Sequence, residues 1–93
     1  MTAGHHIEAW FGLTSREPRA SGLRAHVRFD GAAELHDATF GFQHGWAKFG
    51  EMTHCRVWLR APELALDGVL PTRGFDVLQD GQVIARGEVL TRG

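Results

Sequence analysis

The sequence predicts an all-β domain, and three observations support this fold class. Short runs in which apolar and polar residues alternate recur along the chain, as expected for strands with one buried face. No segment has the apolar period of a helix longer than a single turn. Turn-forming residues separate the runs at intervals of about 8–12 residues, which is typical of a sandwich or a small closed barrel. We favour a closed barrel because closing the sheet removes exposed strand edges.

The clearest element is a hairpin over residues 73–90. Two alternating runs flank Asp80-Gly81. This dipeptide favours a type I′ turn, whose two central residues both need a positive φ. We expect uninterrupted alternation on both arms, with Val83, Ala85 and Val89 on one face and Ile84 on the other.

Four more strands are predicted upstream, at residues 5–14, 23–30, 35–44 and 51–60. Residues 1–4 are expected to form a frayed start and 15–22 an exposed loop. Residues 45–50 are expected to form a connection or a strand end, with a tight turn at Phe49-Gly50, and 62–71 a crossover loop with at most one short strand or helical turn. The predicted inward-facing residues of the four strands are Ile7, Ala9, Phe11, Leu13, Leu23, Ala25, Val27, Phe29, Ala38, Phe40, Phe42, Thr53, Cys55, Val57 and Leu59.

Length and composition limit the function classes. The 93 residues suffice for one domain, residues 1–93, and the net charge of −1 argues against a non-specific nucleic-acid binder. A single cysteine excludes an intramolecular disulfide and a cysteine-based zinc site. We find no secretion signal and no long apolar run, so we expect a cytoplasmic protein that does not contact membranes.

Two groups of outward-facing residues are candidate binding sites. A basic stripe with one aromatic residue can bind a nucleic-acid backbone, or it can be a solvated exterior whose arginines pair with carboxylates. Trp10 and Trp46, like Trp58, fall on outward positions or in loops, and exposed aromatic residues often mark protein interfaces. The stripe consists of Arg24, His26, Arg28, Arg56, Trp58 and Arg60.

No catalytic or metal-binding pattern is present. The six histidines include no pair spaced to chelate a metal from one strand face. Cys55 is predicted to face inward, where a thiol behaves as a small hydrophobe and not as a nucleophile. We therefore expect no enzymatic activity, no metal and no cofactor.

Several short segments follow one another in a familiar order. They are Phe11-Gly12-Leu13-Thr14-Ser15, Gly22-Leu23-Arg24-Ala25-His26-Val27, Phe49-Gly50-Glu51, Leu59-Arg60-Ala61-Pro62, residues 73–81 and Ile84-Ala85-Arg86-Gly87. In this order they resemble the third, C-terminal domain of elongation factor Tu and related translation GTPases, over roughly residues 6–90.

The resemblance implies a closed six-stranded antiparallel Greek-key barrel. It also implies contacts with transfer RNA near His26, Asp80 and Gly81, with Arg24 at the position of a family arginine. The chain lacks the Gly-x-x-x-x-Gly-Lys-Ser/Thr loop of a GTPase, so no GTP binding is expected.

Together these observations predict a non-catalytic binding module. The first hypothesis is interaction with a protein partner or self-association, and it depends on the outward tryptophans and the near-neutral charge. The alternative is binding to the backbone of transfer RNA or another RNA, in a role related to translation.

Overall fold

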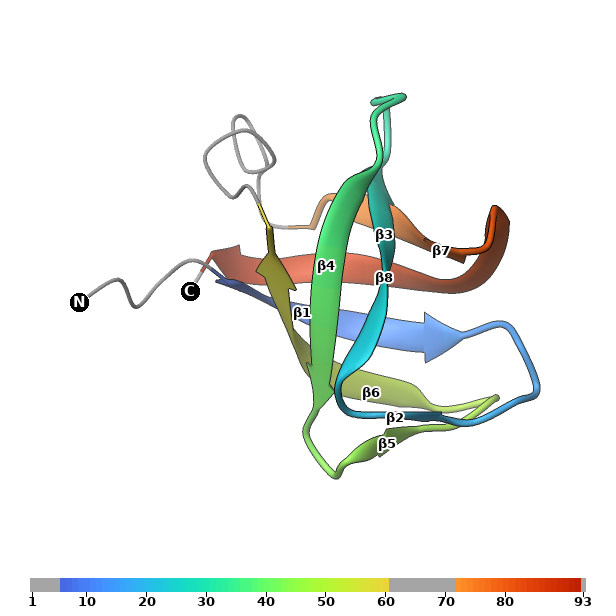
Figure 1. The fold of residues 1–93 in the computed structure, drawn as a ribbon. Helices are drawn as coiled ribbons and strands as arrows, with labels where there is room; N and C mark the ends of the chain where they lie inside the picture. The colour runs from blue at the N-terminus through green and yellow to red at the C-terminus, as the bar shows by residue number, and fades with distance from the viewer. Residues whose placement is uncertain (1–5, 61–71, 93) are drawn as a thin grey trace.

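The computed structural model describes residues 6–60 and 72–92, and these residues form a closed antiparallel β-barrel (Figure 1). The strand order around the barrel is β1-β6-β4-β3-β7-β8, and β8 pairs with β1 to close it. The predicted fold class is confirmed. The six barrel strands are β1 (His6–Leu13), β3 (Leu23–Phe29), β4 (His36–Phe42), β6 (Met52–Leu59), β7 (Gly74–Gln79) and β8 (Gln82–Arg92).

The connections make a Greek key. Strands β3, β4 and β6 are consecutive antiparallel neighbours, and β7 then lies beside β3. The resulting order β7-β3-β4-β6 is the Greek-key arrangement. The predicted crossover loop at 62–71 and the predicted frayed start at 1–4 lie outside the described residues.

The barrel interior is an aromatic core. The ring centroid of Phe11 lies 5.6 Å from that of Phe40 and 4.8 Å from that of Phe42, and the rings of Phe29 and Phe75 are 6.0 Å apart. All predicted inward-facing residues of the four upstream strands are buried except Leu23, which is half-buried and packs against the core. Alternation therefore identified the core face of these strands correctly.

The C-terminal hairpin has the predicted turn but not the predicted alternation. Asp80 and Gly81 have φ values of 54° and 79°, and Gln79 pairs with Gln82, as in a two-residue type I′ hairpin. The pairing shifts between Val77 and Leu78, however, and both of these side chains are buried. Such a bulge inserts one residue on one strand and so changes which face the following side chains occupy.

The alternation predicted for the second strand of this hairpin is wrong at the first residues of the strand. Val83 is exposed, whereas both Ile84 and Ala85 are buried. Ile84 is the extra residue of the irregular pairing, so strict alternation fails there, and regular alternation resumes at Ala85 and continues to Val89.

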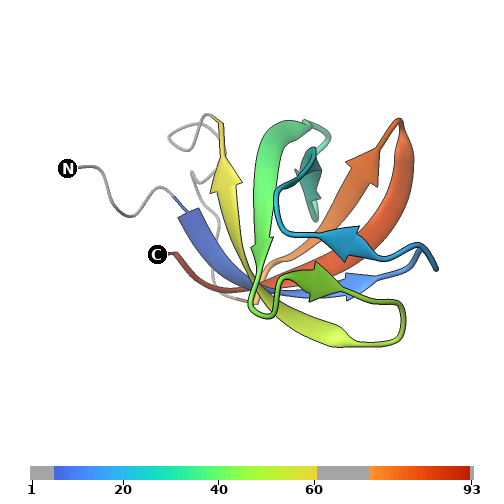
Figure 2. The same cartoon turned by 60° about the horizontal axis from the view of Figure 1, so that its bottom comes forward.

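A two-stranded ribbon lies outside the barrel. Most of residues 15–22 are exposed, as expected, but Arg19–Ala20 form a short strand where a loop was expected. Strands β2 (Arg19–Ala20) and β5 (Trp46–Ala47) pair with each other, and Figure 2 shows them in front at one end of the barrel. Ser21 ties this segment to β4, because its hydroxyl accepts a 2.8 Å hydrogen bond from the backbone nitrogen of Phe42. The Ala47 side chain is buried in the core, so the ribbon is part of the packed structure. The predicted turn at Phe49-Gly50 is confirmed by a backbone hydrogen bond from Glu51 to Lys48 and a positive φ at Gly50.

Gly87 provides a test of the packing between β8 and the core. A Cβ atom at this position would overlap the Phe75 ring and lie 2.6 Å from the carbonyl oxygen of Trp10. We predict that Gly87→Ala lowers the free energy of unfolding by about 1–3 kcal/mol, because overpacking forces neighbours to shift. Urea denaturation followed by circular dichroism measures this change.

The matched control is Gly12→Ala on β1. Its Cβ would lie 2.9 Å from the sulfur of Met52, whose exposed side chain is free to move. We expect a change of less than about 0.5 kcal/mol. Equal effects of the two substitutions would contradict the packing described for Gly87.

Candidate binding surfaces

A polar groove of about 760 Å³ crosses the outer faces of β3, β4 and β6 and reaches the tip of the β7–β8 hairpin. Five of the residues predicted as binding candidates line it, namely Arg24, His26, Trp58, Arg60 and Asp80. The strand register brings them together. Arg24 pairs with Thr39, which pairs with Trp58 on the next strand, and His26 pairs with Asp37 in the adjacent row.

Asp37 neutralises much of the positive charge in this groove. One of its carboxylate oxygens lies 2.8 Å from Nε2 of His26, and the other accepts a 3.2 Å hydrogen bond from Arg60. Within residues 6–60 and 72–92, the guanidinium group of Arg24 has no hydrogen bond or ion pair. The groove therefore holds one unpaired arginine and an exposed tryptophan, with Asp80 as a second carboxylate in its lining.

The rest of the basic stripe lies outside the groove and is also paired. Arg28 donates a 2.9 Å hydrogen bond to Asp76, and Nε of Arg56 donates one of 2.9 Å to Glu8. Gly81, the other candidate at the hairpin tip, does not line the groove. The structure thus favours the interpretation of Arg28, Arg56 and Arg60 as a solvated exterior paired with carboxylates.

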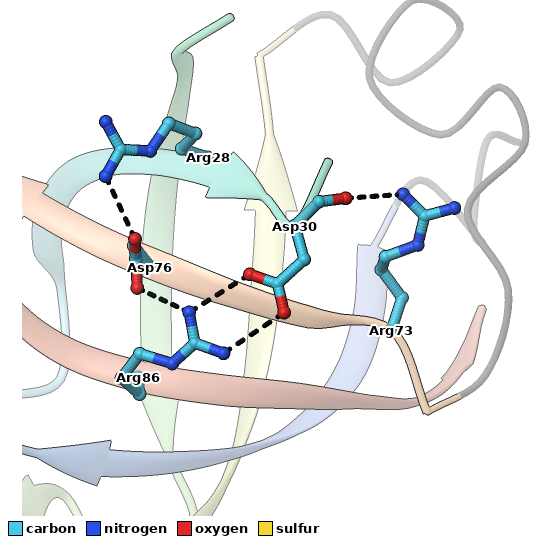
Figure 3. A network of polar contacts seen from close by, with 5 residues as sticks. All are labelled: Arg28, Asp30, Arg73, Asp76 and Arg86. Atoms are coloured by element: carbon cyan, nitrogen blue, oxygen red, sulfur yellow. Dashed lines mark hydrogen bonds and ion pairs between the residues drawn. The ribbon is translucent and has the colours of Figure 1, made fainter. Parts of the chain in front are cut away.

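A second network, which the sequence did not predict, links β3, β7 and β8 (Figure 3). The guanidinium group of Arg86 donates hydrogen bonds of 3.0 and 3.1 Å to the two carboxylate oxygens of Asp30 and one of 2.6 Å to Asp76. Arg73 adds a 2.8 Å bond to the carbonyl oxygen of Asp30. Alternation in the sequence places Arg28, Asp76 and Arg86 on the outer face of their strands. It does not show that they are neighbours, because that depends on the order of the strands in the barrel.

This network shifts the titration of its carboxylates. Hydrogen bonds from Arg86 hold the pKa of Asp30 and that of Asp76 below the usual value, and Arg28 lowers that of Asp76 further. The same bonds raise the pKa of Arg86. Each shift favours the charged, paired form of the network.

Glu8 is the centre of a third polar cluster, on β1 and β6. Its side chain is only 17% exposed and lies 3.0 Å from Nε2 of His6, 3.1 Å from Nε2 of His54 and 2.9 Å from Nε of Arg56. Burial raises the pKa of Glu8, but hydrogen bonds from Arg56 and His6 and the charges of Arg56 and His54 outweigh burial, so the pKa is lowered overall. The described part of the chain contains no group of three His, Cys, Asp or Glu side chains arranged to hold a metal ion.

Cys55 faces the core, as predicted. Burial, with a smaller effect from the charge of Glu8, raises the pKa of Cys55 to about 12. The thiol is therefore protonated near neutral pH and is a poor nucleophile.

Trp10 and Trp46 come together at a pocket of about 280 Å³, which we call the tryptophan pocket. Met52 and His54 also line it, as do the charged residues Lys48 and Glu51. Trp46 is 55% exposed and Met52 is 63% exposed. Exposure confirms the outward positions predicted for the tryptophans, although Trp46 lies on β5 and not in a loop.

No protein-family profile and no curated protein matches the chain. The resemblance to the third domain of elongation factor Tu therefore stays a prediction. In residues 6–60 and 72–92, we find no helix of the length and apolar character needed to cross a membrane.

The Arg86 network predicts a specific dependence of stability on pH. Because the pKa values of Asp30 and Asp76 are lowered in the folded state, the unfolded chain binds more protons in acid. Their contribution is complete above the unfolded pKa of about 4 and disappears as pH falls through the folded values. We predict that Arg86→Gln lowers the free energy of unfolding by about 1 kcal/mol at pH 7, since Arg86 and Asp30 are half-exposed and water partly screens their charges.

Urea denaturation from pH 7 down to pH 3 tests this prediction, with the difference between Arg86→Gln and the unchanged protein shrinking below about pH 4. Arg16→Gln is the control, because Arg16 contacts the Phe49 ring and no carboxylate in the described structure. A difference that is constant across this pH range would show that Arg86 acts through packing alone.

Proposed function

We propose that this barrel is a non-catalytic binding module that uses the tryptophan pocket to bind a protein surface. The observation that carries the proposal is the position of Trp10, Trp46 and Met52 around one pocket, where their side chains are exposed. Aromatic residues and methionine are enriched at the centres of protein interfaces. The neighbouring Lys48 and Glu51 supply the polar rim that such interfaces have.

A general property of tryptophan and the predicted resemblance are both consistent with this proposal. Tryptophan is among the residues whose truncation most often costs 2 kcal/mol or more of binding free energy, about thirtyfold in affinity. The resemblance to the third domain of elongation factor Tu, which packs against other protein domains, also agrees with it. Cytoplasmic location and a role related to translation stay predictions from the sequence.

Binding to an RNA backbone has less support. Neutralised arginines give little counterion release, which supplies most of the affinity for a phosphate backbone. Of the four arginines in the basic stripe, Arg28, Arg56 and Arg60 are paired with carboxylates. The net charge of −1 also opposes non-specific association.

The double substitution Trp10→Ala and Trp46→Ala tests the proposal. We expect at least a tenfold loss of affinity for a captured protein partner, or of self-association. Light scattering after size exclusion over a range of concentrations measures self-association. If the partner is a different protein, it is captured on the tagged protein and purified, and a titration then measures its affinity.

The matched control is Leu35→Ala with Val83→Ala, which removes two exposed apolar side chains elsewhere on the barrel. This variant should keep the interaction, and circular dichroism should show that both variants are folded. A chain that is monomeric at all concentrations and retains the same proteins with and without the tryptophans would refute the proposal.

A further inference from the structure

In the polar groove described above, a small residue of β4 forms the floor between two longer side chains. Thr39 lies directly between Arg24 on β3 and Trp58 on β6 in the strand register. Neighbouring strands are about 4.8 Å apart, so the backbones that carry Arg24 and Trp58 are separated by roughly 10 Å. The volume of about 760 Å³ is in the range of sites for small molecules.

Trp58 is held in position as one wall of this groove. Its six-membered ring lies over Gly41 of β4, where a Cβ atom would be 3.0 Å from Cζ3 and 3.3 Å from Cη2. On the β1 side, the ring of His6 is 5.9 Å away. Trp58 nevertheless remains 43% exposed and lines the groove, so it can accept a flat ring by stacking.

Arg24 is the opposite wall, and its charge is available. The other basic side chains that line the groove, His26 and Arg60, both contact the carboxylate of Asp37. Gln79 fixes the backbone at Arg24, because its Nε2 donates a 3.4 Å hydrogen bond to the carbonyl oxygen of Arg24 and its Oε1 accepts one of 2.8 Å from Arg19. An uncompensated guanidinium group binds phosphate oxygens through two parallel hydrogen bonds.

Asp80 completes the lining at the hairpin tip, next to Gln79. It lies on the far side of Arg24 from Trp58, because the strand order is β6-β4-β3-β7, and its carboxylate would repel a phosphate placed at that end of the groove. Thr39, the floor between Trp58 and Arg24, has a hydroxyl that can hydrogen-bond to hydroxyl groups of a ligand. The groove therefore suits a ligand with three parts in one molecule: a flat ring, an anion and hydroxyl groups between them. A ribonucleotide has these parts.

We propose that this groove is a second binding site, which takes a ribonucleotide with its base on Trp58 and its phosphate on Arg24. The site is separate from the tryptophan pocket, and it needs neither Trp10 nor Trp46. It also differs from binding along a duplex backbone, because a single base must stack. One stacking contact and one charged contact predict a Kd of roughly 0.1–1 mM, since association itself has a large entropic cost.

Titration with the four ribonucleoside 5′-monophosphates tests this proposal directly. Nitrogen-15 NMR resolves the three tryptophan indole N–H signals, and Trp58→Phe assigns that of residue 58. We expect the Trp58 signal to move and saturate while those of Trp10 and Trp46 stay in place. Movement of the Trp10 or Trp46 signals without that of Trp58 would overturn the proposal.

Variants then separate the two contacts. Arg24→Gln should weaken nucleotide binding about tenfold, whereas the control Arg16→Gln should leave it unchanged. Trp58→Ala should abolish it, and Trp58→Phe, which keeps a ring and the fold, should retain most of it. The Trp10→Ala and Trp46→Ala double variant should bind nucleotide normally, so failure here and failure of the proposed protein interaction are distinguishable. Binding that survives both Arg24→Gln and Trp58→Ala would overturn the assignment.

Four further ligands identify what the groove recognises. Inorganic phosphate and a nucleoside without phosphate should each bind at least tenfold more weakly than the nucleotide. A single-stranded hexaribonucleotide that binds with the same dependence on Trp58 and Arg24 would show that the groove takes one unit of a strand, and a clear preference for the monophosphate would show that it takes the free nucleotide. Tighter binding of inorganic phosphate, or of duplex RNA with no dependence on Trp58, would contradict the proposal.

Discussion

The pairing of β8 with β1 is the constraint on which the rest of this structure depends. It joins the last described strand to the first and closes the barrel. Closure gives each of the six described barrel strands a hydrogen-bonded neighbour on both sides and encloses the rings of Phe11, Phe40 and Phe75 in a single core. The outward-facing side chains then fall into fixed rows across neighbouring strands. The groove over Thr39 is built from such rows, and the tryptophan pocket combines residues of β1 and β6 with Trp46 of the ribbon.

Charge pairing decides which parts of that exterior can bind a partner. Carboxylates neutralise three of the four arginines in the basic stripe, and Arg86 connects two aspartates on different strands. Because these charged groups already form ion pairs with one another, they have few hydrogen-bonding positions left for a ligand. Two places differ. The tryptophan pocket exposes apolar surface, and the groove over Thr39 combines the unpaired Arg24 with Trp58.

Much of the fold could be predicted from the sequence, because each strand has one buried face and so shows a period of two. The ribbon of β2 and β5 was missed since a two-residue strand has no period. The bulge adds one residue to β8, Ile84, opposite Val77 and Leu78, and so reversed the expected position of Val83. For the binding surfaces, alternation identified the outward residues but not their neighbours. The contact of Glu8 with Arg56 joins strands 48 positions apart, and local patterns carry no information on that pairing.

Hydrogen exchange of the β1 amides tests barrel closure most directly. In an antiparallel sheet, successive amides of a strand point to opposite neighbours. Residues from Ala9 to Gly12 lie between β6 and β8 in the closed barrel, so their amides should all exchange slowly and with similar rates. If β8 did not pair with β1, every second amide in this segment would face water. Alternating fast and slow exchange along β1 would therefore contradict the closed barrel and the surfaces built on it.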